Sequence, residues 1–338
     1  MIAIHNGGGW AASWIEYCRD NDIPHKVVCC YDSNILEQIR DCSGLMWHFS
    51  HSRPQDLLLA RNVLNAAELM GLKVFPNFYT NWHFDDKLSQ KYLFEALELP
   101  AAPSWAFFER DKALEFAKNC ELPIVAKLRR GAGSYNVRLM KKRGQLKKYI
   151  NRMFGKGYAS APAVLADAKT KFKVALNKGG VKGVLNRLKK APNFYRVFSR
   201  GRKYLGNEKG YAYFQKFIPG NTCDYRIKVV GDVAWGFRRM VRKNDFRASG
   251  GGMLDFDYHK IPEELIRMAF NCASKLKMQS VAFDFVLNQG INPVIVEISY
   301  GFGIDIGESE GYWDRNIEYY EKGFDPTHIV IDYFLKQI

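Results

Sequence analysis

Short apolar runs alternate with longer amphipathic segments over the first 80 residues. Buried strands are predicted for MIAIHN, HKVVCCY, GLMWHF and KVFPN. Between them, apolar positions recur every three to four residues, as in DLLLARNVLNAAELMG, which predicts helices. Because strands and helices alternate, we expect residues 1–84 to form an α/β domain with a parallel sheet.

The pattern changes after this region. The segment DDKLSQKYLFEALELP has helical spacing, with Asp85 or Asp86 as the N-cap and Pro100 at its end. After Gly210 the apolar positions alternate with period two, and DYRIKVV-GD-VAWGFRRMV and VAFDFVL-NQGIN-PVIVEIS read as hairpins. The expected fold class is therefore α/β followed by α+β. Its expected divisions are 1–84, 85–140, 141–210 and 211–338.

Positive charge is concentrated in one of these divisions. The chain has 50 Lys and Arg against 35 Asp and Glu, a net charge of +15. Between Lys141 and Gly210 there are 20 basic residues against two acids, whereas the rest of the chain is close to neutral. This basic segment predicts a solvated helical face, a polyanion-binding surface or a membrane-surface contact. No RNA-binding or helix-turn-helix pattern accompanies it, which argues against specific nucleic-acid recognition.

The cysteines and the N-terminus indicate the cell compartment. Seven scattered cysteines without CxxC spacing are typical of reduced thiols and argue against a disulfide framework or structural zinc. The N-terminal residues lack the features of a signal peptide, and no apolar run is long enough to span a membrane. We therefore expect a cytoplasmic protein.

Two carboxylates are expected to meet on the last hairpin. Folding about NQGIN places Asp284 opposite Glu297, and strict alternation places Ile295 and Ser299 on the same face as Glu297. Close carboxylates repel unless a cation lies between them, and hard oxygen ligands suit Mg²⁺ that carries substrate phosphates. The alternative is a pair of acids on a solvent-exposed sheet face.

Further chemistry-bearing motifs occur along the chain. The strand PIVAKL brings Lys127 to the loop RRGAGSYNV, where Gly131 and Gly133 permit a close approach to phosphate. The other candidates are Lys87, FQKFIPG with Lys216 and Ile218, DYRIKVV with Asp224 and Arg226, Arg239 on the partner strand, and Arg247 in NDFRASGGGM.

These motifs, in this order, resemble those of the ATP-grasp superfamily, near the glutathione-synthetase and ribosomal-protein glutamate ligase branch. The resemblance covers most of the chain outside the basic segment. It implies an N-terminal α/β lobe and two antiparallel subdomains that clamp ATP. Two positions depart from the family pattern: Lys216 replaces the hinge Glu, and Ser299 replaces the Asn of the metal site.

The resemblance also implies a role for each position. Lys87 and Lys127 would hold the ATP phosphates beneath the loop of Gly131 and Gly133. Lys216 and Ile218 would flank the adenine, and Asp224 would bind the ribose. Asp284, Glu297 and Ser299 would ligate Mg²⁺. Arg247 would steady the transferred phosphoryl group, while Arg226 and Arg239 would hold the acceptor carboxylate.

The implied activity is ligation of a carboxylate to an amine through an acyl phosphate. The opening lobe, KLRRGAGSYNV and EISYGFG resemble ligases associated with bacterial surface polysaccharides, which implies a uronic acid or another acidic saccharide as the acid substrate. Two alternatives remain: an ATP-grasp kinase acting on a hydroxyl, and a polyanion or membrane-surface binder that uses the basic segment. The sequence leaves the oligomeric state open.

Two loops of the first domain carry candidate ligand contacts outside this motif set. Gly7–Gly9 joins a predicted strand to a helix, where it either cradles phosphate or simply turns the chain. His48, His51 and Arg53 follow another predicted strand, where they either contact the acceptor or form an ordinary loop.

Overall fold

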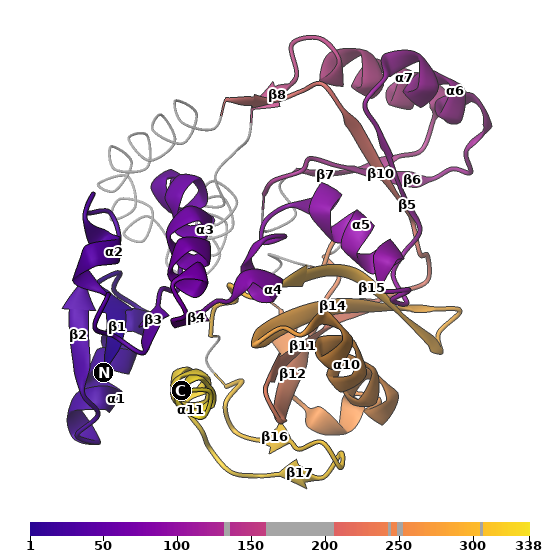
Figure 1. Cartoon of the computed structure of the whole chain (residues 1–338). Coiled ribbons are helices and arrows are strands. Elements are labelled where there is room, and N and C mark those ends of the chain that lie inside the picture. The colour runs from indigo at the N-terminus through magenta and orange to yellow at the C-terminus, as the bar shows by residue number, and fades with distance from the viewer. Residues whose placement is uncertain (132–135, 160–205, 243–244, 249–252, 305–306) are drawn as a thin grey trace, which may run out of the picture.

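The structure is a computed structural model that describes residues 1–131, 136–159, 206–242, 245–248, 253–304 and 307–338. Figure 1 shows a parallel N-terminal sheet beside two further sheets, with the last helix returning to the first lobe. Gly133 and residues 160–205 of the basic segment, including its expected helices, lie outside the described residues.

The N-terminal sheet is parallel throughout, as its alternating pattern predicts. Its strand order is β2-β1-β3-β4. The strands are β1 (Ile2–His5), β2 (His25–Val28), β3 (Gly44–Met46) and β4 (Lys73–Phe75). The helices are α1 (Trp10–Asp20), α2 (Ile35–Gln38), α3 (Pro54–Leu69) and α4 (Phe78–Asn81). Helix α2 packs against α3, whereas α1 packs against the C-terminal helix α11 (Pro326–Leu335).

The second sheet is antiparallel, with the order β5-β10-β6-β7. Its strands are β5 (Ser104–Phe107), β6 (Ile124–Lys127), β7 (Val137–Met140) and β10 (Ala212–Lys216). Its helices are α5 (Lys87–Ala96), α6 (Arg110–Asn119) and α7 (Arg143–Met153), and a short pair, β8 (Tyr158–Ala159) and β9 (Asn207–Glu208), lies beyond. Strand β10 enters this sheet between β5 and β6, so the sheet spans the expected division at residue 211.

The third sheet contains both predicted hairpins. Its path is β15-β14-β11-β12-β16-β17, with β13 paired to β12. The strands are β11 (Cys223–Val230), β12 (Val233–Met240), β13 (Leu254–Asp255), β14 (Ser280–Asn288), β15 (Asn292–Ser299), β16 (Tyr312–Trp313) and β17 (Tyr319–Tyr320). A 3-10 turn, η1 (Tyr258–Lys260), precedes α10 (Glu263–Leu276), which packs on β11 and β14.

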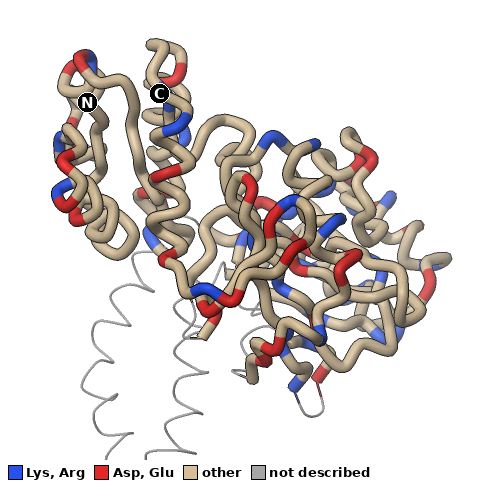
Figure 2. Tube along the Cα trace, turned by 90° about the horizontal axis from the view of Figure 1, so that it is seen from below, with Lys and Arg blue, Asp and Glu red and all other residues tan. Residues whose placement is uncertain are grey.

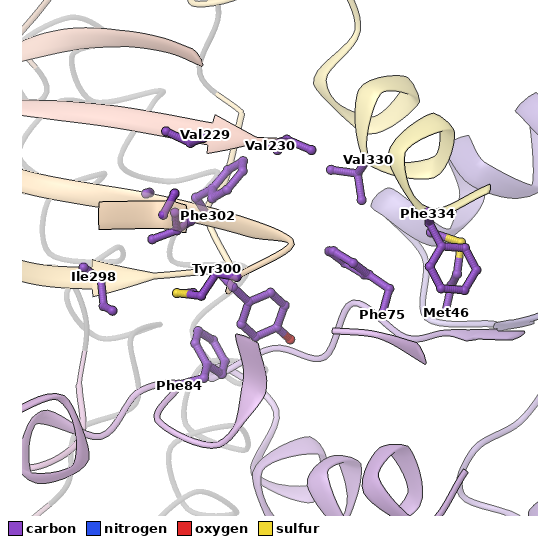
Figure 3. Close-up of a cluster of buried hydrophobic side chains, with 14 of the residues drawn as sticks. Met46, Phe75, Phe84, Val229, Val230, Ile298, Tyr300, Phe302, Val330 and Phe334 are labelled. Carbon is purple, nitrogen blue, oxygen red and sulfur yellow. The ribbon is translucent and has the colours of Figure 1, made fainter. Parts of the chain in front are cut away.

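One continuous core joins the first and third sheets. Figure 3 shows Phe334 of α11 beside Met46 and Phe75 of the first lobe, with Tyr300 between Phe75 and Phe84. The Tyr300 hydroxyl donates a hydrogen bond to the Phe49 carbonyl over 2.8 Å. Burial of this aromatic cluster fixes the first lobe against the sheet that carries the predicted metal ligands.

Acidic and basic positions are interspersed along the described chain, as Figure 2 shows. The two termini lie side by side in both views because α11 packs against α1. Among the described helices, none has the length and apolar character needed to cross a bilayer.

Candidate active site

A cavity of about 660 Å³ lies where the second and third sheets meet. Its polar lining includes Lys127 from β6, Asp224 and Arg226 from β11, Arg239 from β12, Asp284 from β14, and Glu297 and Ser299 from β15. Its apolar lining includes Val125, Val137, Phe217, Ile218, Val286 and Val296. Residues from most of the predicted motifs therefore line a single cavity.

The predicted pairing of the two carboxylates is present. Asp284 is the direct cross-strand partner of Glu297, and Ser299 pairs with Ala282, two positions before Asp284. The expectation for Ile295 is wrong: Ile295 pairs with Phe285, whereas Glu297 pairs with Asp284. The register shifts between those pairs, so a bulge at Val296 turns Ile295 to the face opposite Glu297. Fully buried, Ile295 packs in the core instead of lining the cavity.

Two arginine side chains bind Asp284 and the neighbouring Asp224. Arg226 holds Asp284 through two hydrogen bonds of 2.8 and 2.9 Å. Arg239 also reaches Asp284, at 2.7 Å, and binds Asp224 through bonds of 2.7 and 2.8 Å. Burial opposes ionisation of Asp284, but the two guanidinium groups outweigh it and hold its pKa well below the usual range. The predicted acceptor-binding arginines thus neutralise the predicted ribose and metal ligands.

The two predicted phosphate lysines are both buried. Lys87 Nζ lies 3.0 Å from Glu297 Oε1 and donates to the Gly131 carbonyl over 2.9 Å. Lys127 Nζ donates to the Val296 carbonyl over 3.2 Å. Burial lowers the pKa of Lys127 to about 8, although the Glu297 carboxylate favours its charged form. Lys127 lines the cavity, whereas Lys87 lies behind the lining and contacts the lining residue Glu297.

The phosphate loop is anchored at its start. Helix α5 begins at Lys87 because the Asp86 side chain accepts hydrogen bonds from the amides of Leu88 and Ser89. The preceding Asp85 accepts the Gly131 N–H over 2.9 Å. Gly131 has a φ of +126°, and a Cβ there would lie 2.4 Å from Asn136 Nδ2, so the position favours glycine.

The predicted adenine hinge borders the apolar side of the cavity. Lys216 ends β10, and its N–H donates to the Pro103 carbonyl over 2.8 Å. Its ammonium points to Glu121 at 3.6 Å and is half exposed. Lys216 and Ile218 both line the cavity. The predicted hinge therefore presents backbone groups and apolar surface to the cavity rather than an acidic side chain.

Arg247 lies at the cavity with a partner that the sequence analysis did not identify. Asp245 receives Arg247 Nε and Nη2 at 3.0 and 2.7 Å. The sequence signal for this pair is the N-D-F-R segment, in which an acid precedes an arginine by two residues. Other lining residues missed from the sequence are Gln215 and Phe84, whereas His51, a candidate acceptor contact in the sequence, also lines the cavity. Gln215 carried no signal, because residues Ala212 to Gln215 of β10 are all buried and such a continuous pattern does not show which side chain lines a cavity.

The donor set fits Mg²⁺. Two carboxylates and a hydroxyl on adjacent strands are hard oxygen ligands, which Mg²⁺ prefers. Within the described ranges, no group of three or more His, Cys, Asp and Glu side chains is arranged to hold a metal ion. The site therefore offers few protein ligands, as is usual where phosphates and water complete the Mg²⁺ shell.

Comparison with known proteins identifies the fold. No protein-family model and no curated protein matches the sequence. Among solved structures, D-alanine–D-alanine ligase from Bacillus anthracis is 13% identical, with a TM-score of 0.55 over 99% of this chain and 97% of that one. A RimK domain ATP-grasp protein from Sphaerobacter thermophilus is 13% identical, with a TM-score of 0.54 over 99% and 100%. The ATP-grasp ligase PsnB, complexed with a minimal precursor, is 13% identical, with a TM-score of 0.53 over 99% and 98%. The chain therefore has the ATP-grasp fold.

Proposed function

We propose that this protein is an ATP-dependent ligase that joins a carboxylate to an amine, with ATP and Mg²⁺ as cofactors. The observation that carries the proposal is the direct pairing of Asp284 with Glu297 in a cavity that also contains Lys127. The likeness to two ligase structures and a RimK domain ATP-grasp protein over nearly the whole chain supports it.

The residues take the following roles in this proposal. Nucleotide is bound by Lys87 and Lys127 at the phosphates, Gly131 and Gly133 in the loop, Lys216 and Ile218 at adenine, and Asp224 at ribose. Asp284, Glu297 and Ser299 hold Mg²⁺, which, when bound, neutralises phosphate charge. Arg247 contacts the transferred phosphoryl group, and Arg226 and Arg239 contact the acceptor carboxylate.

Ligand binding requires an exchange of ion pairs. Arg226 and Arg239 are both bound to Asp284, so neither is available to an acceptor carboxylate in that arrangement. A substrate carboxylate can replace Asp284 on Arg226 with the same bidentate geometry. Asp284 then keeps its contact with Arg239 alone and can turn an oxygen toward a cation, so acceptor and metal binding support each other.

The chemistry needs no protein nucleophile. A carboxylate oxygen of the acid attacks the γ-phosphorus, and the bond to the bridging oxygen breaks to release ADP. The amine then attacks the acyl carbon, and phosphate leaves. The chain's residues position the reactants and stabilise charge, which are the main contributions in phosphoryl transfer.

For the acid, we propose a uronic acid sugar or a precursor of a surface polysaccharide, handled in the cytoplasm. The support is the excess of positive charge in residues 141–210, which suits an acidic saccharide. The same charge would suit a peripheral contact with an anionic membrane surface.

An ADP-release screen tests the activity. The purified chain with Mg²⁺ and ATP is assayed against a panel of sugar acids, each with and without amines and hydroxylamine. A ligase gives ADP with the correct acid, and hydroxylamine traps the acyl phosphate as a hydroxamate. ADP formation with a hydroxylamine-resistant phosphoryl product would identify a kinase. No turnover together with steeply salt-dependent polyanion binding would identify a binding protein.

A further inference from the structure

The N-terminal sheet contains a topological switch point. Strand β1 lies between β2 and β3 in the sheet. The chain therefore passes from β1 to β2 on one side of it and then crosses to β3 on the other side. In open parallel sheets, ligands bind outside the carboxyl ends of the strands at such a point. The loops that follow β1 and β3 here are residues 6–9 and 47–53.

His5, at the carboxyl end of β1, has a buried hydrogen-bond donor without a partner. The ring is 2% exposed, and its Nδ1 accepts the Cys30 N–H over 3.0 Å. Burial and the nearby Arg53 charge lower the pKa of His5 to about 4, so the ring is neutral and its proton must lie on Nε2. No acceptor for Nε2 exists in the described part of the chain, and Trp47 Nε1, in a ring 4.6 Å away, also lacks one.

This donor faces the loop after β1. A Cβ built on Gly7 would lie 3.7 Å from His5 Nε2 and 3.5 Å from Arg53 Nη1. Arg53 Nη2 donates to the Gly7 carbonyl over 2.7 Å, which holds the guanidinium beside the loop. The same Cβ would lie 3.2 Å from His5 Cδ2, so the space that His5 and Arg53 face beside Gly7 is no larger than a methyl group.

The adjacent carboxylate is already in use. Asp56, which is fully buried, accepts the Tyr31 hydroxyl on Oδ1 and the Ser50 N–H on Oδ2. It therefore does not satisfy His5. The space is lined by donors and one cation.

The start of α1 adds further positive potential. This helix has 11 residues and begins after Gly9, which offers no capping side chain. Gly8 and Gly9 have φ values of +68° and +57°, which turn the backbone into the helix. The amides of Ala11 and Ala12 already donate to the Gly8 and Gly9 carbonyls, so the helix acts on an anion through its dipole.

This space adjoins the cavity of the candidate active site. Trp10, the first residue of α1, stacks on His48 with ring centroids 4.5 Å apart. It also makes an edge contact with Phe302 at 5.4 Å. Phe302 and His51 both line the cavity, so the aromatic contacts of Trp10 connect the 6–9 loop to the wall of the cavity.

We propose that the 6–9 loop, His5 and Arg53 bind an anionic group of the acid substrate other than the carboxylate that is activated. The term substrate rests on the proposed function, whereas the anion site itself rests on the geometry above. The acid is accordingly a dianion or higher anion whose second charge is a carboxylate or a phosphate.

Calorimetric titration of the full chain tests the anion site, with malonate and inorganic phosphate as separate probes. Wild-type protein should bind at least one probe saturably, and the preferred probe identifies the second charge. Gly7→Ala places a methyl group in the space, and Arg53→Gln removes the cation. Arg53→Gln should weaken binding about tenfold, as expected for loss of a charge-assisted contact, and Gly7→Ala should weaken it because the methyl group excludes the anion.

Matched controls separate this site from general effects. Gly144→Ala adds a methyl group in open space on α7, and Arg40→Gln removes an exposed arginine of the same lobe; both should bind like wild type. No saturable binding of either probe to wild type, or equal binding by Gly7→Ala and Arg53→Gln, would overturn the proposal. So would binding that is lost only in Lys127→Ala, because the anion would then occupy the nucleotide cavity.

The ligase proposal and the anion site can fail separately. If wild type binds a probe, Gly7→Ala weakens it, and no acid and amine pair yields ADP, the ligase proposal fails while the anion site stands. If ADP forms with a monoanionic acid and Gly7→Ala leaves the KM of that acid unchanged, the anion site fails alone.

Discussion

Asp284 is bound by two guanidinium groups inside the cavity where a divalent cation is expected. Three acids of this cavity have basic partners: Asp224 with Arg239, Asp284 with Arg226 and Arg239, and Glu297 with Lys87. Buried charges are tolerated only when they are paired, so the chain needs these contacts. The same residues exchange partners when Mg²⁺ and ATP bind in the proposed mechanism. The pairing is therefore compatible with metal binding and also keeps Asp284 and Glu297 ionised.

Asp284→Asn and Glu297→Gln should each reduce Mg²⁺-dependent ADP formation on the order of a hundredfold or more, because a directed charge at the phosphates is lost. The measurement is steady-state ADP release at saturating Mg²⁺, with thermal melting to verify the fold. Glu263→Gln, which changes an exposed acid on α10, is the matched control and should keep full turnover. Ser299→Asn should be tolerated because it keeps an oxygen ligand. Near-normal turnover of Asp284→Asn or Glu297→Gln would disprove the metal assignment.

Lys127→Ala should weaken ATP binding about tenfold or more, since a charge-assisted hydrogen bond contributes roughly 1.5–3 kcal/mol. Calorimetry with Mg·ATP measures the affinity. Lys73→Ala, which removes an exposed lysine at the start of β4, should leave it unchanged. Equal affinities for Lys127→Ala and wild type would remove Lys127 from the phosphate site.

At the scale of elements, local patterns predicted the hairpins and the capped start of α5, and both are present. The register of the β14–β15 hairpin near its turn could be predicted by counting residues from the turn, because side chains alternate with period two and the turn is short. The bulge at Val296 could not be predicted this way, since an extra residue leaves no mark on apolar alternation. The insertion of β10 between β5 and β6 was equally hidden, because it depends on long-range pairing. Most residues of the candidate site could be predicted from their sequence motifs. The ion pairs among them could not, because these depend on how side chains from different strands pack together.

A buried ion pair ties β11 to the loop that follows β15. Lys228 Nζ lies 2.6 Å from both carboxylate oxygens of Glu308 and donates to the Gly303 carbonyl over 2.8 Å. Both side chains are almost completely buried. Glu308→Gln should therefore lower the free energy of unfolding by about 3–5 kcal/mol, as expected when one partner of a buried pair loses its charge.

Urea denaturation measures this loss, and Glu310→Gln, a neighbouring acid that lines the adjacent surface pocket, serves as the control. Replacing both Lys228 and Glu308 by Met should recover part of the stability because no buried charge is left. A loss below about 1 kcal/mol in Glu308→Gln would show that the pair does not hold the loop.

Across the whole molecule, the fold places the candidate active site between lobes. The cavity forms where two antiparallel sheets meet, and α11 packs the N-terminal sheet against the same structure. Because the aromatic core around Tyr300 is shared, the switch point of the first sheet adjoins the cavity rather than facing away from it. An acid substrate that spans both sites would use the first lobe for recognition and the other two for chemistry.

The last prediction concerns the positive charge of residues 141–210. Two acids cannot neutralise 20 basic residues within this segment, so its charge either stays solvated or meets an anion. If that anion is the acid substrate, reversing the charges of Arg187, Lys189 and Lys190 should raise the acceptor KM at low salt and leave the ATP KM nearly unchanged. The difference should shrink with added salt, because exposed charges are screened beyond about 8–10 Å near physiological ionic strength. Equal kinetics at low salt would indicate a solvated segment, and a change confined to the ATP KM would assign the charge to nucleotide binding instead.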